Sequence, residues 1–305
     1  MVNNWHTKTI QFFFSTLRND RITKNSSSEL DVLISFINDF NPNELYLYLV
    51  KHISDKAAHL IHWFERDSSV LNRLYEYASV GAKRYETSID GLFRSDYYSF
   101  VHDEGAGMDI MQVHFHNNAA FFAKQIATKS FNLAMMMNAI YHYEECLKFA
   151  LILNFRKDTG YFRKASYHAI KDTADVLKLF VKTYFNDDTE LYLKPYYSRF
   201  KIIYVKILDG ITEHPNLREM ALNSVLELTK TYFEFTGSKR KKLAKDLFEI
   251  EYRVAEYYFI SGNHKKAREH KLNAELAYYN VKKLEKNSGT LWHNYATNKL
   301  LQLDK

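Results

Sequence analysis

The sequence predicts an all-α protein made of stacked antiparallel helical hairpins that wind into a right-handed superhelix. Nine glycines and three prolines in 305 residues are too few for a turn-rich β-sandwich or barrel. Apolar residues recur at spacings of three and four along most of the chain, as in Leu33, Ile37 and Phe40. Strand-like alternation extends beyond a few residues only at 111–116. Helices are therefore the expected element throughout.

Capping residues place several of these helices. Ser28 with Asp31 resembles a capping box, and Asn41-Pro42 supplies an N-cap followed by a helix-starting proline. Together they predict a helical hairpin over residues 28–52. Gly210 is expected to end a helix that starts at Pro195. The other stretches expected to be helical are 57–64, 70–77, 119–126, 133–149, 176–184 and 222–232.

One segment interrupts the helical spacing and divides the chain into parts. Residues 102–118 hold two glycines, several acids and three histidines, and we expect them to form a loop. The expected organisation is an N-terminal helical part at 1–101, this loop, and a C-terminal helical-repeat part at 119–305.

Bulk composition narrows the class of protein. Hydrophobic residues make up 46% of the chain, enough for a sizeable core, so disorder is excluded. A single cysteine, Cys146, excludes an internal disulfide framework and a cysteine-rich zinc site. No secretory signal and no apolar run of membrane-spanning length is recognisable, so a cytoplasmic location without membrane contact is expected. We expect no cofactor and no bound metal.

A repeat motif lies near the C-terminus. Between Glu251 and Leu284, small residues, a tyrosine and a glycine fall at spacings of 3, 4, 5 and 7, namely Ala255, Tyr258, Gly262, Ala267 and Ala274. Small residues let two helices approach closely, and glycine permits the tight turn between them. This pattern resembles the tetratricopeptide repeat over residues 246–285. Gly160 and Ala165 repeat the glycine-to-alanine spacing 102 residues earlier, three times the 34-residue period of that family.

Irregular arrays of this kind resemble the peptide-sensing Rap-type regulators and the arbitrium receptors. The hairpin at 30–50 is similar to the segment that follows the DNA-binding domain in arbitrium receptors. Only some 25 residues precede Ser28, and they show no helix-turn-helix. The resemblance implies a sensor or partner-binding protein without the DNA reader.

These features favour a non-catalytic, regulatory binding protein that holds a peptide or protein segment in a concave groove. In the frame of the resemblance, the groove residues are Glu249, Tyr252, Glu256 and Phe259. A homodimer is compatible with this architecture.

A second interpretation makes the chain an enzyme. Arg163 and His168 spell Arg-x4-His, which resembles the motif of HEPN ribonucleases, and residues 141–151 resemble the first core helix of that family. The resemblance implies metal-independent RNA cleavage in which His168 acts as a general base and Arg163 stabilises phosphate charge. The alternative is a surface arginine and a half-buried histidine.

Two further patterns suggest ligands. Basic clusters at 238–242 and 264–268 allow a sequence-independent nucleic-acid binder, although a solvated helix face is the favoured interpretation. Phosphate contacts would weaken steeply with ionic strength, whereas apolar peptide docking would not. His114 and His116 are residue types that bind metal ions. Residues two apart on a helix point to opposite sides, so this pair could share a metal ion only in an extended segment. A loop without a metal site is the favoured interpretation.

Overall fold

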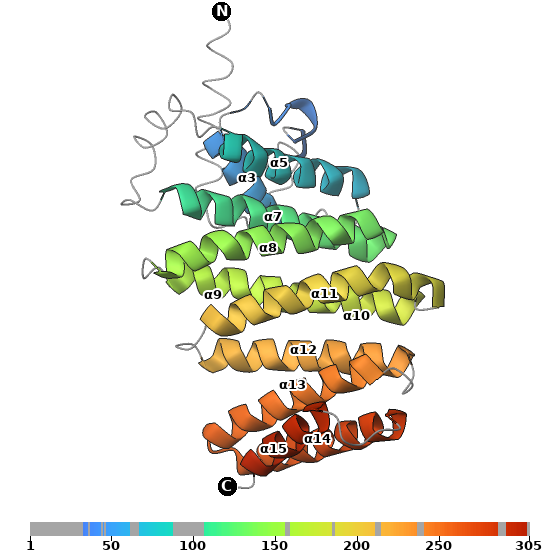
Figure 1. The fold of residues 1–305 in the computed structure, drawn as a ribbon. Coiled ribbons are helices and arrows are strands. Elements are labelled where there is room, and N and C mark those ends of the chain that lie inside the picture. Colours follow the sequence, from blue (N-terminus) through green and yellow to red (C-terminus); the bar gives the residue numbers. More distant parts are fainter. Residues whose placement is uncertain are drawn as a thin grey trace, which may run out of the picture. The chain divides into compact units, whose positions relative to one another are not determined.

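The computed structural model describes residues 33–35, 37–43, 45, 47–61, 67–87, 107–155, 159–184, 187–210, 215–236, 241–285 and 291–303. Every regular element among them is helical, which confirms the all-α prediction (Figure 1). None of the described helices is long and apolar enough to cross a membrane. The chain divides into two compact units, Met1–Tyr161 and Phe162–Lys305, and each is described separately.

Four long helices among the described residues form the framework of the first unit. They are α3 (Leu47–His59), α5 (Ser68–Thr87), α7 (Gly107–Ser130) and α8 (Leu133–Phe155). Figure 1 shows α7 and α8 side by side, and α7 also packs on α3 and α5. The core contains Ile53, Leu74, Tyr77, Phe115 and Phe122, all fully buried.

The expected loop at 102–118 is wrong for the residues that the structure describes, because 107–118 belong to α7. Gly107 is the first residue of that helix, where a glycine does not interrupt it. The physical reason is a buried apolar stripe at helical spacing, formed by Met111, Phe115, Ala119, Phe122 and Ile126. The boundary between the two units accordingly lies at residues 161 and 162, not near residue 110.

Close packing explains why one glycine lies inside α5. A Cβ atom at Gly81 would overlap the ring of Phe115, which is fully buried on α7. The missing side chain therefore lets α5 and α7 approach each other.

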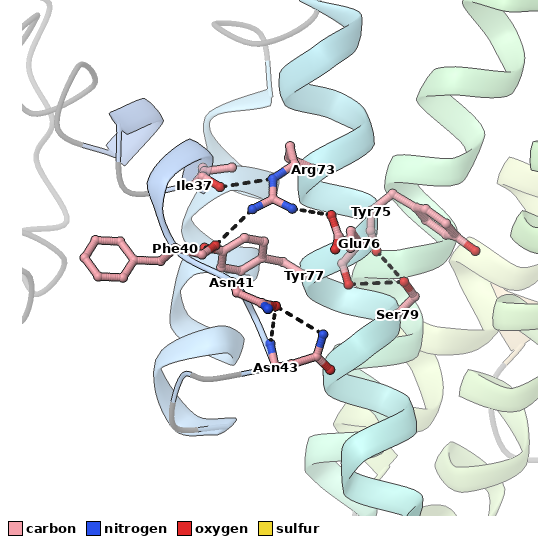
Figure 2. A network of polar contacts seen from close by, with 9 residues as sticks. All are labelled: Ile37, Phe40, Asn41, Asn43, Arg73, Tyr75, Glu76, Tyr77 and Ser79. Atoms are coloured by element: carbon pink, nitrogen blue, oxygen red, sulfur yellow. Dashed lines mark hydrogen bonds and ion pairs between the residues drawn. The ribbon is translucent and has the colours of Figure 1, made fainter.

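Side chains of α5 hold the segment that precedes α3 (Figure 2). The Arg73 guanidinium donates to the carbonyl oxygens of Ile37 (3.3 Å) and Phe40 (3.0 Å), and the Tyr77 hydroxyl also donates to Phe40 (2.7 Å). Carbonyls at the end of a helix lack partners within the helix, so these donors satisfy them. The Asn41 side chain accepts from the backbone N–H of Asn43 at 3.0 Å, as a turn-forming residue does.

The second unit continues the pattern of antiparallel helices. It contains most of α9 (Thr159–Tyr167), α10 (Thr173–Tyr184), α11 (Asp187–Gly210), α12 (Pro215–Thr236), α13 (Lys241–Ile260), α14 (His264–Leu284) and α15 (Leu291–Gln302). A five-residue π-helix, His168–Asp172, joins α9 to α10. Gly210 ends α11 as expected, but Pro195 lies inside that helix and does not start it.

Candidate functional site

The predicted hairpin near the C-terminus is present. Gly262, with φ of +79°, lies in the turn between α13 and α14, a backbone conformation that favours glycine. Asn263 caps α14, because its side chain accepts from the backbone N–H of Lys266. The small residues Ala255, Ala267 and Ala274 are buried, as the spacing predicts. Gly160, in contrast, lies in the first turn of α9 and not in a turn between helices.

Buried carboxylates connect this hairpin to its neighbours. Glu251 on α13 is 1% exposed, and it pairs with Nζ of Lys230 on α12 at 2.7 Å and with Nδ1 of His270 on α14 at 2.6 Å. Glu285 pairs with Lys245 at 2.9 Å and with His293 on α15 at 2.7 Å. A buried carboxylate needs such partners, since an uncompensated buried charge is costly. These contacts fix α12, α13, α14 and α15 with respect to one another.

The four predicted groove residues follow a single stripe along α13. Their spacings of three, four and three bring Glu249, Tyr252, Glu256 and Phe259 to one side of the helix. Glu249 and Glu256 are half-buried, and Phe259 is exposed beside His264 in an edge-on contact. Tyr252 is 3% exposed. Three of the four side chains therefore reach solvent along this stripe.

Helix α15 contacts the first two residues of the same stripe, Glu249 and Tyr252. The Tyr295 hydroxyl donates to Glu249 at 3.2 Å, and the Tyr252 hydroxyl lies 3.1 Å from Glu256 and 3.3 Å from Gln302. The Lys299 ammonium stands 4.9 Å from the centre of the Tyr252 ring. Burial raises the pKa of Glu249 above its ordinary value, with the Tyr295 hydrogen bond acting in the opposite direction. We call the stripe together with Tyr295 and Lys299 the α13–α15 surface.

The two candidate catalytic residues are not brought together by any contact that we observe. Arg163 is exposed on α9, and His168 is the first residue of the π-helix. The partner of His168 is a carboxylate: its Nδ1 lies 2.8 Å from Oδ2 of Asp172, which is itself buried. The ring of Tyr167 stands edge-on to His168. π-Helical segments occur often at functional sites, so this His168–Asp172 pair is kept as a second candidate.

The histidines of α7 point to different partners. His114 contacts Asp55 on α3 at 3.2 Å, while Nδ1 of His116 lies 2.9 Å from Nδ1 of His142 on α8. This matches the expectation for residues two apart on a helix. Among the described residues, no three His, Cys, Asp or Glu side chains are grouped so that they could hold a metal ion. His102, Asp103 and Glu104 lie outside those residues.

Sequence reasoning missed two features. One is the buried contact between His116 and His142, whose partners are 26 residues apart. The other is an exposed apolar stripe on α14, formed by Leu272, Leu276 and Tyr279. Its spacing is visible in the sequence, but such spacing normally indicates a core-facing side.

Comparisons with known proteins do not assign the chain to a family. No protein-family model matches the chain, and neither does any curated protein. One similar solved structure is a designed protein from work on the computational design of self-assembling cyclic homooligomers. It is 10% identical with a TM-score of 0.37, covering 90% of this chain and 94% of that one. Another is a de novo designed helical repeat protein, 15% identical with a TM-score of 0.28, covering 87% and 99%. The assignment to helical-repeat-like all-α proteins rests on the helices of this chain itself.

Proposed function

We propose that this chain is a non-catalytic binding scaffold that recognises a peptide or protein segment on the α13–α15 surface. The observation that carries the proposal is the stripe of Glu249, Glu256 and Phe259 along the first helix of a tetratricopeptide-like hairpin. The two carboxylates can orient a ligand through polar contacts, and the aromatic ring on the same side of the helix offers it an apolar contact. A regulatory role, of the kind that a resemblance to peptide-sensing receptors would imply, is part of the proposal.

The arrangement of this surface favours pre-organised binding. Tyr252 is buried and its hydroxyl contacts Glu256 and Gln302, so it positions the neighbouring groups and offers little surface to a ligand. The ion pairs of Glu251 and Glu285 hold the helices that carry this surface in place. Side chains held in this way lose less conformational entropy when a ligand binds.

The proposal is tested by selecting peptides from a random library against the purified full-length chain. We expect selected peptides to bind with dissociation constants of about micromolar order. The Glu249→Gln/Glu256→Gln variant should bind them about tenfold more weakly, a loss of about 1.4 kcal/mol, because it removes the two negative charges of the surface. Fluorescence anisotropy measures the change.

A matched control is Glu227→Gln, whose side chain is 67% exposed on α12. It should leave the affinities unchanged. Peptides that bind the Glu249→Gln/Glu256→Gln and Phe259→Ser variants as tightly as the original chain would show that the ligand site lies elsewhere.

The ribonuclease alternative is supported by one observation, the hydrogen bond between Asp172 and His168. A carboxylate that orients an imidazole is a recurring arrangement for a general base. If the chain cleaves RNA, then cleavage of a labelled oligonucleotide in EDTA should disappear in His168→Ala and fall strongly in Arg163→Ala. The scaffold proposal expects no cleavage by the original chain. Cleavage that depends on His168 would overturn the scaffold proposal in favour of the ribonuclease.

The nucleic-acid alternative depends on two basic clusters, and the structure describes only part of them. Residues 238–240 lie outside them, and Lys241 pairs with Glu285. Lys265, Lys266 and Arg268 are exposed at the start of α14.

A further inference from the structure

The side of α14 that faces away from α13 carries three large apolar residues in solvent. Leu272, Leu276 and Tyr279 are 57%, 55% and 56% exposed. Their spacings of four and three bring them to a single face. The opposite side of α14 is occupied by Ala267, Ala274, Ala277 and Val281, which are buried. The helix thus has two apolar faces, and the hairpin uses only one.

Cations lie at both ends of the outward face, and one exposed carboxylate, Glu269, lies between Lys265 and Leu272. Lys265 and Arg268 precede the apolar residues, Lys283 follows them, and all three are exposed. Arg268 is four residues before Leu272, and Lys283 is four residues after Tyr279, so both fall on the same face. With a rise of about 1.5 Å per residue, Lys265 and Lys283 are about 27 Å apart along the helix. We call Lys265, Arg268, Leu272, Leu276, Tyr279 and Lys283 the outward face of α14.

This charge distribution selects among the possible occupants. In a symmetric contact between two copies, parallel or antiparallel, the cationic ends of one copy would meet those of the other, which is unfavourable. A nucleic acid requires cations along the path of its phosphates, whereas the centre of this face offers leucines. An amphipathic helix with an apolar centre and carboxylates near its ends complements both properties.

We propose that the outward face of α14 docks an acidic amphipathic helix of a partner protein. Apolar residues of the partner, spaced by four and three, would pack on Leu272, Leu276 and Tyr279. Carboxylates of the partner would pair with Arg268 and Lys283. The inference rests on the proposed scaffold function, but it uses a face of α14 distinct from the α13–α15 surface.

The probe for the test is a fluorescein-labelled synthetic peptide of about 20 residues, long enough to form several helical turns. It carries leucines at spacings of four and three, with glutamates at both ends of the same face. We expect it to bind the full-length chain with a dissociation constant of about micromolar order. Leu272→Ser/Leu276→Ser should weaken binding at least about tenfold. The matched control Ile202→Ser/Val205→Ser removes two apolar residues of α11 that are 51% and 50% exposed, and it should leave binding unchanged.

Reversing the charges of the peptide and of the outward face gives a second, independent test. A peptide with lysines in place of the glutamates should bind the original chain at least about tenfold more weakly than the acidic peptide. Arg268→Glu/Lys283→Glu should reverse that preference. Restored binding to the lysine peptide also demonstrates that this variant is folded.

Four results would overturn the inference. They are equal binding of both peptides by the original chain, no loss with Leu272→Ser/Leu276→Ser, displacement of the acidic peptide by a single-stranded RNA, and a dimer of the original chain that this double variant dissociates. Failure here is distinguishable from failure of the proposed function. Glu249→Gln/Glu256→Gln should leave acidic-peptide binding intact, and Leu272→Ser/Leu276→Ser should leave binding of the library-selected peptides intact.

Discussion

Phe115→Ala is expected to lower the free energy of unfolding of the first unit by about 3–5 kcal/mol. The ring of Phe115 is fully buried and lies in the core shared by α3, α5 and α7. Its removal leaves a cavity beside Gly81 of α5. Rigid helices on several sides limit collapse into that cavity, so the cost should fall in the upper part of the range for large-to-small substitutions.

Hydrogen exchange measured by mass spectrometry resolves this effect, because the two units need not unfold together. Peptides from α5 and α7 should lose protection, and peptides from α13 and α14 should retain theirs. Met137→Ala on α8 is the control, since Met137 is 51% exposed and its loss should change stability by less than about 0.5 kcal/mol. Equal loss of protection in the two variants would show that Phe115 does not anchor this core.

The second large effect is a loss of stability of the first unit in mild acid. Burial lowers the pKa of His116 to about 3, with contributions from His142 and Lys148, and burial lowers the pKa of His142 to about 4. Both values lie below the ordinary 6.5. In their contact of 2.9 Å one ring nitrogen donates and the other accepts, which requires at least one neutral ring.

The sign follows from proton binding. Below pH 6.5 the unfolded chain takes up protons on these histidines while the folded unit does not, so stability falls as the pH decreases towards about 4. Two groups of this kind give a slope of about 2.7 kcal/mol per pH unit at most. We therefore expect the first unit to lose about 2 kcal/mol or more between pH 7 and pH 5. Asp55, whose pKa is lowered by His114 and Lys51 against the effect of burial, adds a further loss only below its ordinary value of 3.8.

Urea unfolding between pH 7 and pH 5, followed by hydrogen exchange in α7 and α8, measures this slope. His142→Gln removes one titrating group and should reduce the slope by about half. His264→Gln changes an exposed histidine of the other unit and should not alter it. A slope that is unchanged in His142→Gln would place the acid sensitivity in other groups.

Local structure near the C-terminus was predictable from the residues themselves. Gly262 adopts the positive φ that its place in the motif implies, and the alanines of α13 and α14 are buried at the spacing that helices require. These properties depend on residues within one or two turns of each other.

The error at 107–118 has a different origin. The prediction of a loop relied on two glycines and several polar residues and gave less weight to the apolar stripe of Met111 and Phe115. In the structure, α3 and α5 bury that stripe. A helix of this kind is stabilised by packing more than by propensity. Its neighbours are distant in sequence, so a local pattern does not contain them.

The candidate sites divide in the same way. The alignment of Glu249, Tyr252, Glu256 and Phe259 on one side of α13 follows from spacing alone. That Tyr252 is buried and contacts Gln302 depends on α15, 50 residues away. Likewise, nothing local distinguishes Phe115, which is buried, from Leu272, which is exposed.

The sequence by itself thus determined that this protein is all-helical, where its C-terminal hairpin turns, and which residues share a helix face. Only the tertiary structure decided which of those faces is covered and that His116 meets His142. The physical reason is that helical periodicity is a property of neighbouring residues, whereas burial and pKa depend on groups that other helices bring close.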